Sequence, residues 1–513
     1  MEKILLLIFA ICLFSCVEDK GSYKFEKLNE VSVDSISMEE AIFCISKVDS
    51  IFVNPEIKGT ITGDDEGNYE YEWYICETGT HSHTTISREK NLAYLVDIDP
   101  GTYFLYFEIK DKSTGLKWLK GTNLSVITAV TKGFMILGDL EDGRMALDMV
   151  SMPEERDTTV IEDVFNNSEY NFTESEKLLF AGYRRGADAQ TLWLTTKEGT
   201  HRLTNQEAFE YIAEVNDYGL IETEFEHKTP VRILDMFPHP STQIRSATNR
   251  GYITEDLVVQ NSIILGEYFA TPCNRYSSSS MTLFKPYPLA FVNGAHSSGY
   301  AGIIIYDMDA NRFVRLNTYR SATYCMKLDD YDKDPFPWDQ AGTGRKIVYG
   351  ENSYDAPYGA SYAIMRDADN NYFIYKFTIQ TANTFMVNYR KDNLYNVDLS
   401  LALDFDKASH YVFMSNRSVV IYSVGTKLYM YDYAHGQIIS RDLGREITYL
   451  EAEYCSTGSR DMFLVATYDT TEKGVIRKLQ VDSDPNVLEF IDIPRHEWKT
   501  RLKVKDVKWK NTP

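Results

Sequence analysis

The sequence is poor in cysteine, in basic residues and in long apolar runs. Seven cysteines are scattered over 513 residues, so stability need not come from disulfides. The length is ample for large apolar cores and predicts two or more domains. Lys and Arg number 53 against 75 Asp and Glu. The resulting net charge of −22 argues against nucleic acid and anionic lipid headgroups as partners.

Motifs of catalysis are also missing. We find no Gly-x-Ser-x-Gly elbow, no complete phosphate-binding loop and no His-Glu-x-x-His zinc motif. We therefore name no catalytic residue and no metal ligand, expect no cofactor, and predict that the protein is not an enzyme. Segments 307–311 and 367–371 begin like calcium loops, but Arg312 and Tyr372 replace the required glycine. Hairpin turns explain both segments better, and calcium stays an unproven alternative.

The one long apolar run lies at the N terminus. Residues 4–14 follow Lys3 and precede the small residue Ser15. A membrane-spanning helix needs about 20 apolar residues, and this run is too short. We therefore predict a signal peptide over residues 1–15 that is removed on export.

The residues around the predicted cleavage point resemble a lipobox. Leu13, Phe14 and Ser15 precede Cys16, whose thiol would carry the lipid and whose backbone would become the new N terminus. Several acyl chains on one cysteine give durable membrane anchoring. Glu18 and Asp19 resemble the acidic signal that sends Bacteroidetes lipoproteins to the outer face of the outer membrane. Retention in the periplasm is the alternative. Residues 16–27 would form a polar tether between the lipid and the first domain.

Residues 28–130 read as a small all-β unit. In the segment 69–75 apolar and polar residues alternate, and a second alternating segment, 103–109, follows a turn at residues 99–101. A last strand is expected over residues 117–127. Strands at this spacing predict an immunoglobulin-like β-sandwich. Cys44 and Cys76 are the one pair of cysteines that their positions favour for a disulfide.

These residues resemble a known family. The lipobox, the Glu-Asp-Lys-Gly-Ser-Tyr segment after it, the Tyr-Glu-Trp-Tyr strand and the Gly-Thr-Tyr strand are similar to Bacteroidetes PKD-like family lipoproteins. The Trp-Asp-Phe-Gly-Asp-Gly core of PKD domains is absent, because Tyr74, Ile75 and Cys76 follow Trp73. The resemblance covers about residues 16–130. It implies a role beside SusC/SusD-type importers of nutrients in the outer membrane.

Residues 131–513 repeat one theme, in which an apolar strand, a polar turn and a second apolar strand follow one another. After a first unit at residues 133–149, such turns recur near residues 198, 310, 370, 435 and 473. Their intervals exceed the repeat of about 40 to 50 residues in compact propeller blades, which insertions would explain. We predict a β-propeller of about seven blades. The strand at residues 504–509 would close the ring, and a large β-sandwich is the alternative.

One segment of this half predicts a helix. Thr204 and Glu207 match a capping box, and an apolar stripe follows at helical spacing. The stripe consists of Ala208, Phe209, Tyr211, Ile212 and Val215. We expect a helix inserted at the edge of a blade.

The segment 329–339 is the candidate binding loop. Tyr331, Phe336 and Trp338 would offer stacking faces for a sugar or an anchor for a protein, while Asp332 and Asp334 could hold calcium. The alternative is that these aromatic rings pack on the rim of the propeller.

The sequence therefore predicts a lipid-anchored, surface-exposed binding or accessory subunit of a SusC/SusD-type system that imports glycans or oligopeptides. Two alternatives stay open. One is a glycoside hydrolase or lyase that uses a carboxylate pair in the propeller's central well, although no pair can be chosen from sequence. The other is a structural adhesin.

Overall fold

The computed structural model describes residues 27–34, 38, 41–63, 68–80, 82–153, 158–180, 192–204, 209–215, 225–237, 249–262, 271–292, 302–316, 323–353, 359–383, 386–453 and 460–511. The chain divides into two compact units between Thr128 and Ala129. Within the described ranges there is no α-helix, and none of their helical turns could cross a membrane. The predicted all-β class is confirmed.

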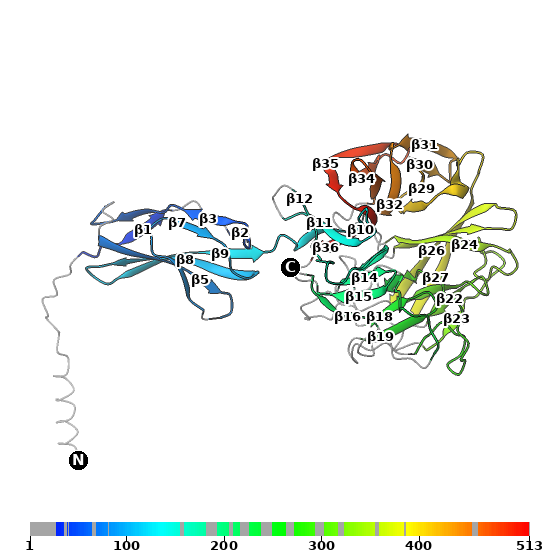
Figure 1. Cartoon of the computed structure of the whole chain (residues 1–513), viewed down its shortest axis with the longest axis horizontal. Helices are drawn as coiled ribbons and strands as arrows, with labels where there is room; N and C mark the ends of the chain where they lie inside the picture. The colour runs from blue at the N-terminus through cyan, green and yellow to red at the C-terminus, as the bar shows by residue number, and fades with distance from the viewer. Residues whose placement is uncertain are drawn as a thin grey trace, which may run out of the picture. The chain divides into compact units, whose positions relative to one another are not determined.

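The first unit is a β-sandwich (Figure 1). Its larger sheet has five strands in the order β2-β9-β8-β5-β6. They are β2 (Ile42–Ile45), β9 (Lys117–Ile127), β8 (Gly101–Asp111), β5 (Tyr69–Glu77) and β6 (Thr84–Ser87). The opposite layer consists of two pairs, β1 (Val31–Asp34) with β4 (Glu56–Gly59) and β3 (Ser50–Val53) with β7 (Leu92–Leu95). The strands predicted over residues 69–75, 103–109 and 117–127 are confirmed.

Trp73 is at the centre of the sandwich core. Its ring is fully buried and stacks on Phe107 with ring centroids 4.3 Å apart. Its indole N–H donates to the carbonyl oxygens of Glu89 and Lys90, both at 3.1 Å. Because successive side chains of a strand point to opposite faces, the alternating residues of β5 and β8 supply one apolar face to this core.

The strand order excludes a disulfide between Cys44 and Cys76. Cys44 lies on β2 and Cys76 on β5, and β9 and β8 run between these strands. Three strand spacings separate the two cysteines by about 14 Å, whereas a disulfide needs Cα atoms within about 7 Å. This sequence-based expectation was wrong because proximity along the chain does not report the order of strands in a sheet.

The second unit is a seven-bladed β-propeller (Figure 1). Each blade is an antiparallel meander that runs from an inner to an outer strand, and blade 3 has three strands among the described residues where the others have four. Blade 1 comprises β36 (Lys503–Asn511), β10 (Lys132–Asp139), β11 (Met145–Ser151) and β12 (Thr159–Ile161). Blade 2 comprises β13 (Ser175–Phe180), β14 (Leu192–Thr196), β15 (Gly199–Leu203) and β16 (Tyr211–Glu214), and blade 3 β17 (Asp235–Phe237), β18 (Asn249–Ile253) and β19 (Val258–Ser262).

The remaining blades follow in chain order. Blade 4 comprises β20 (Phe291–Val292), β21 (Ile303–Asp307), β22 (Arg312–Leu316) and β23 (Cys325–Lys327). Blade 5 comprises β24 (Lys346–Ser353), β25 (Ala360–Arg366), β26 (Tyr372–Asn383) and β27 (Met386–Asn396). Blade 6 comprises β28 (His410–Met414), β29 (Val419–Val424), β30 (Lys427–Asp432) and β31 (Gln437–Asp442), and blade 7 β32 (Glu446–Ala452), β33 (Met462–Asp469), β34 (Lys473–Val481) and β35 (Phe490–Thr500).

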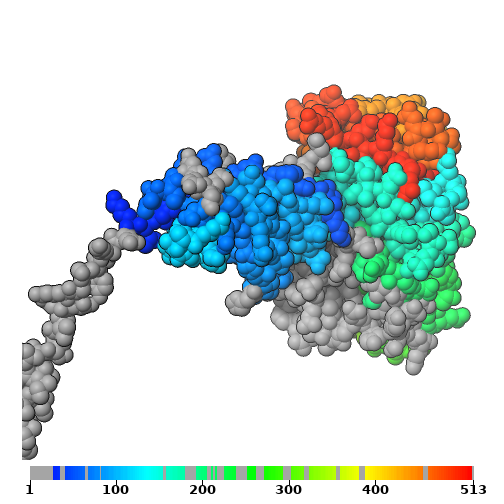
Figure 2. All heavy atoms as spheres, turned by 60° about the vertical axis from the view of Figure 1, so that its left-hand side comes forward, coloured from blue at the N-terminus to red at the C-terminus, as the bar shows by residue number. Residues whose placement is uncertain are grey.

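The C-terminal strand closes the ring, as predicted. β36 pairs with β10 and is the inner strand of blade 1. The other three strands of this blade, β10 to β12, are the first strands of the propeller. In the space-filling view the red C-terminal surface lies against the cyan surface of the first propeller strands (Figure 2). Because both ends of the unit share one sheet, the ring cannot open without breaking a strand ladder.

Long segments between the blades account for the length of the repeat, and they place aromatic side chains between neighbouring sheets. Phe165 and Phe172 lie between β12 and β13, Phe336 and Trp338 between β23 and β24, and Phe405 between β27 and β28. All are buried in apolar clusters shared by neighbouring blades. Each insertion therefore fills the gap between two twisted sheets.

The predicted helix at residues 204–215 was wrong. Residues 205–208 lie outside the described ranges, and Tyr211–Glu214 form β16, which pairs with β15. The hydroxyl of Thr204 accepts the backbone N–H of Glu210 at 2.8 Å, which closes a loop and does not cap a helix. Without a partner, the edge of β15 would leave backbone N–H and C=O groups without hydrogen bonds. Pairing of Tyr211–Glu214 with β15 therefore prevailed over the helical spacing of the apolar residues.

Candidate functional site

The predicted lipidation residue Cys16 and the export residues Glu18 and Asp19 lie outside the described residues. The candidate loop at residues 329–339 is fully described. It connects β23, the outer strand of blade 4, to β24, the inner strand of blade 5. Its side chains divide into a buried part and an exposed tip.

The buried part contains two of the three predicted aromatic residues. Phe336 and Trp338 each expose only 2% of their surface. Phe336 stacks on Tyr375 with centroids 4.0 Å apart, and Trp338 meets Phe377 edge-on. The hypothesis that these two rings are free stacking faces is therefore wrong, because the gap between blades 4 and 5 holds them.

A buried lysine anchors the loop. Lys391 lies on β27 and its side chain is 4% exposed. Its Nζ lies 2.5 Å from Oδ1 of Asp330 and 2.6 Å from Oδ2 of Asp334. The hydrogen bond from Lys391 lowers the pKa of Asp334. Asp330 also accepts the backbone N–H groups of Trp338 and Asp339. The carboxylates of Asp330 and Asp334 are thus engaged by protein donors.

The tip of the loop faces solvent. Tyr331 is 70% exposed, and Asp332, Lys333 and Pro335 are exposed as well. The backbone N–H of Tyr331 donates to Oδ2 of Asp334 at 3.0 Å, so the anchored carboxylate also shapes the tip. An aromatic ring with a neighbouring carboxylate and ammonium is therefore presented from a fixed base.

A second set of polar residues lies on the inner strands, which surround the axis of a propeller. Carboxylates here accept backbone N–H groups of the next blade. Asp506 accepts that of Leu178 at 2.8 Å, Asp235 that of Ala290 at 2.8 Å, and Glu351 that of Phe413 at 2.9 Å. These bonds join blades 1 to 2, 3 to 4 and 5 to 6 respectively.

Blades 5 and 7 contain the same short motif. In Ile347-Val-Tyr-Gly-Glu351 and Ile447-Thr-Tyr-Leu-Glu451 the tyrosine hydroxyl donates to the glutamate two residues on and contacts a carbonyl oxygen of the next blade. Both inner strands carry a bulge between the isoleucine and the tyrosine. Sequence reasoning missed this Ile-x-Tyr-x-Glu repeat, although the identical spacing was the signal that could have revealed it.

The second copy of the motif ends in an ion pair. Nζ of Lys508 lies 2.7 Å from Oε2 of Glu451 and 3.1 Å from Oδ1 of Asp506. Desolvation acts to raise the pKa of Glu451, but the charge of Lys508 and the hydrogen bonds from Lys508 and Tyr449 together outweigh it, and the pKa is lowered. Burial raises the pKa of Asp235 to about 6, against a smaller opposing effect of the Ala290 N–H. Burial and the nearby Glu451 raise the pKa of Tyr449.

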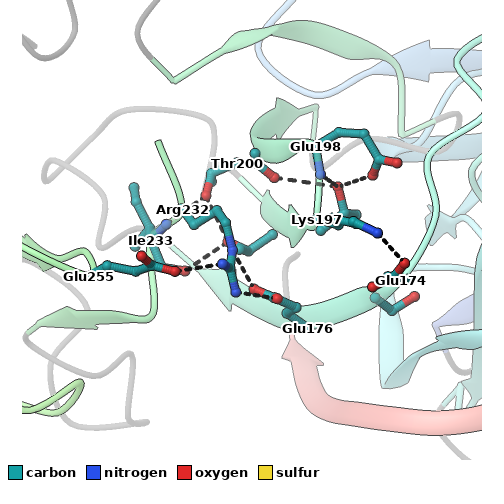
Figure 3. A network of polar contacts seen from close by, with 12 residues as sticks. Glu174, Glu176, Lys197, Glu198, Thr200, Arg232, Ile233 and Glu255 are labelled. Atoms are coloured by element: carbon teal, nitrogen blue, oxygen red, sulfur yellow. Dashed lines mark hydrogen bonds and ion pairs between the residues drawn. The ribbon is translucent and has the colours of Figure 1, made fainter. Parts of the chain in front are cut away.

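A clamp of charged residues joins blades 2 and 3 (Figure 3). The guanidinium of Arg232 donates to both carboxylate oxygens of Glu176 on β13 and to Glu255 in the β18–β19 turn. The hydroxyl of Thr200 accepts the backbone N–H of Ile233 at 2.7 Å beside the clamp. The side chains of Arg232, Glu176 and Glu255 are about 30% exposed, and the guanidinium pairs with both carboxylates, so the clamp holds two blades in register.

The described residues contain no group of three or more His, Cys, Asp or Glu arranged to hold a metal ion. The segments that begin like calcium loops are hairpin turns. Oδ1 of Asp307 accepts the N–H groups of Asp309 and Ala310, and Oδ1 of Asp367 accepts those of Asp369 and Asn371.

Comparison with known proteins adds a partial family match. The model of the PKD-like family matches residues 16–171, which include the sandwich and the first propeller strands. No curated protein matches the sequence.

Several solved structures share a weak overall similarity. A quinonprotein alcohol dehydrogenase-like protein from Bacteroides thetaiotaomicron is 12% identical with a TM-score of 0.37, over 95% of this chain and 100% of that one. The β-propeller domain of Cps50 (Swd1) from Myceliophteria thermophila is 13% identical with a TM-score of 0.35, over 69% and 98%. The WD40 domain of SCAP from fission yeast is 9% identical with a TM-score of 0.31, over 71% and 90%. The assignment of the propeller comes from the blade topology itself.

Proposed function

We propose that the protein is a lipoprotein anchored through Cys16 to the outer membrane and exposed on the cell surface, where it acts as a non-catalytic binding or accessory subunit of a SusC/SusD-type uptake system. The lipobox pattern and the acidic residues Glu18 and Asp19 support the location. The PKD-like match supports the resemblance from which the importer is inferred. The cargo is a glycan or an oligopeptide.

The observation that carries the binding role is the anchored tip at residues 331–335. The inner-strand carboxylates already accept bonds from neighbouring blades, so the propeller is a stiff scaffold. Lys391 fixes the base of the loop on that scaffold and leaves the ring of Tyr331 in solvent. Because the backbone of the tip is held at its base, less order has to be gained on binding, and the tip is suited to contact a ligand or a partner.

The test is an affinity pull-down of the lipidated protein from detergent-solubilised outer membrane. We expect an importer barrel and its lid lipoprotein to be recovered with the native protein and to be lost with Cys16→Ala. Tyr331→Ala should weaken recovery. Phe52→Ala is the matched control, because Phe52 on β3 is 69% exposed and Tyr331 is 70% exposed. Recovery of no importer proteins by the native protein contradicts the accessory role. Equal recovery by Tyr331→Ala and Phe52→Ala contradicts a role of the tip.

A surface hydrolase is the second candidate, because two inner-strand carboxylates have opposite pKa shifts. The pKa of Asp235 is raised to about 6, as a general acid needs, while that of Glu451 is lowered. Both groups already bind protein donors, which is why we rank binding first. Turnover of a polysaccharide that Asp235→Asn and Glu451→Gln both abolish would favour this candidate over the binding role.

A further inference from the structure

The segment between blades 5 and 6 holds three leucines in solvent. It runs from the end of β27 to the short 3-10 helix η5 (Phe405–Lys407). Leu399 and Leu401 are each 39% exposed and Leu403 is 53% exposed. Single exposed aliphatic residues are ordinary, but three within five positions form a local apolar patch. We call these three residues the leucine ridge.

The backbone of the leucine ridge is held in place. The backbone N–H of Ala402 donates to the carbonyl oxygen of Asp398 at 2.8 Å, which closes a turn. The hydroxyl of Tyr422 donates to the carbonyl oxygen of Leu403 at 2.7 Å. Ala402 and Phe405 are buried in an apolar cluster of blades 5 and 6. The leucines are therefore presented on a backbone that needs little further ordering when a partner binds.

A polar side chain borders the leucine ridge in the β30–β31 turn. A Cβ atom at Gly436 would lie 3.2 Å from Cδ1 of Leu401, so this turn packs against the ridge. The side chain of His435 is 71% exposed, and its Nδ1 lies 2.8 Å from Oδ2 of the buried Asp432. A partner that covers Leu401 therefore meets an imidazole that is already oriented by a carboxylate.

The charges around the leucine ridge are mostly negative. Residues 398–407 include three aspartates and one lysine, which are Asp398, Asp404, Asp406 and Lys407. Nζ of Lys407 lies 2.6 Å from Oδ1 of Asp404, so this pair leaves the charges of the exposed Asp398 and Asp406. These charges oppose an anionic membrane surface, and a symmetric contact with a second copy would bring the same aspartates together. They complement a protein that carries Lys or Arg beside apolar side chains.

We propose that the leucine ridge is the face that docks on the importer, where it meets apolar side chains bordered by Lys or Arg. The proposal rests on the proposed accessory role and adds a second contact to the tip at Tyr331. Interfaces commonly have an apolar core and a polar rim. The leucines supply the core here, and Asp398, Asp406 and His435 supply the rim.

A variant without the leucines tests the docking. In the pull-down from solubilised outer membrane, Leu399→Ser, Leu401→Ser and Leu403→Ser are combined in one ridge variant. We expect recovery of importer proteins to fall at least about tenfold, because the apolar area that drives docking is removed. Urea unfolding should give the ridge variant and the native protein the same midpoint, since the three side chains are outside the core.

The matched control removes three exposed aliphatic side chains at scattered positions. It combines Leu28→Ser, Leu119→Ser and Met281→Ser, at residues that are 60%, 55% and 66% exposed. This control should recover the importer proteins as the native protein does. A loss of recovery in both triple variants overturns the ridge as a specific docking face.

Charge reversal tests the chemistry of the partner. Asp406→Lys keeps the leucines and should lower recovery about fivefold at low salt, with the loss disappearing at high salt, where charges are screened. Asp369→Lys is the control, because Asp369 is an exposed aspartate in the β25–β26 turn. Unchanged recovery with Asp406→Lys overturns a basic partner.

The outcomes separate the leucine ridge from the accessory role. Equal recovery by the native protein and the ridge variant overturns the ridge and leaves the accessory role standing. No recovery by the native protein overturns both. A native dimer that the ridge substitutions dissociate, measured by light scattering, overturns the importer as the occupant and assigns the ridge to a second copy.

Discussion

Nζ of Lys508 lies 2.7 Å from Oε2 of Glu451, so an ion pair joins the C-terminal strand of the propeller to the inner strand of blade 7. The β36–β10 ladder closes the ring within blade 1, and this pair connects blade 1 to its neighbour. Tyr449 strengthens the junction, because its hydroxyl donates to Glu451 at 2.7 Å and contacts the carbonyl oxygen of Val507 at 3.0 Å. Closure therefore combines a strand ladder with a charge pair.

Lys508→Met should destabilise the propeller, because it leaves the carboxylates of Glu451 and Asp506 without their cation. The side chain of Glu451 is 42% exposed, so water can solvate part of its unpaired charge. We therefore expect a loss of about 1 to 3 kcal/mol in the free energy of unfolding. Urea unfolding measures it. Lys505→Met on the same strand is the control. Lys505 is 38% exposed and 3.9 Å from Asp139, so a loss below about 0.5 kcal/mol is expected. Equal losses would contradict a specific role of the ion pair.

Asp235→Asn should change how stability depends on pH. The folded pKa of about 6 lies above the ordinary value of 3.8, so the folded state binds more protons between these values. The Asp235 contribution therefore favours folding below pH 4 and is lost as pH rises to 6. Lys177 and Lys508 oppose this shift only partly.

At pH 7.5 the asparagine variant should exceed the native protein by about 1 to 3 kcal/mol, and at pH 4 the two should agree. The amide oxygen can still accept the Ala290 N–H, so the interblade bond is retained. Unfolding curves at both pH values give the difference. A constant difference across pH would show that the Asp235 carboxyl titrates normally.

Trp338→Ala and Tyr331→Ala should have different effects on stability, because Trp338 lies in the buried base of the candidate loop and Tyr331 at its exposed tip. Removing the buried indole creates a cavity between blades 4 and 5, and we expect a loss of about 3 to 5 kcal/mol. Tyr331 is 70% exposed, so its replacement should cost less than about 0.5 kcal/mol. Thermal or urea unfolding of both variants checks this. A large loss for Tyr331→Ala would mean that the tip is part of the core.

Gly474→Ala should disturb the packing of blade 7. A Cβ atom at Gly474 would lie 2.7 Å from Cγ2 of Thr500 and even closer to the backbone oxygen of Leu502, which cannot move aside as a flexible side chain can. We expect a loss of about 2 to 4 kcal/mol in the free energy of unfolding. Gly342→Ala is the control, because nothing lies within 4 Å of its Cβ position. Similar unfolding midpoints for both variants would contradict the close approach.

The sequence by itself determined the elements whose signals are local. Alternating residues predicted β5, β8 and β9, and polar turns between apolar strands predicted the repeating blades and the closing strand β36. The marked turns mostly join the second and third strands of a blade, although the one at Gly436 joins β30 to β31. Side-chain alternation and turn chemistry act over a few residues, so one chain segment contains all the information. The lipid anchor on Cys16 stays a prediction.

Tertiary structure alone decided which residues meet. The capping box that begins at Thr204 predicted a helix, but Tyr211–Glu214 form a strand that pairs with the edge of β15. Phe336 and Trp338 became core because a gap between two twisted sheets lay beside their loop. The contacts between Lys508 and Glu451 and between Cys325 and Cys273 exist only because the propeller places these segments side by side. Such contacts depend on the order of strands and blades, and no short stretch of sequence encodes that order.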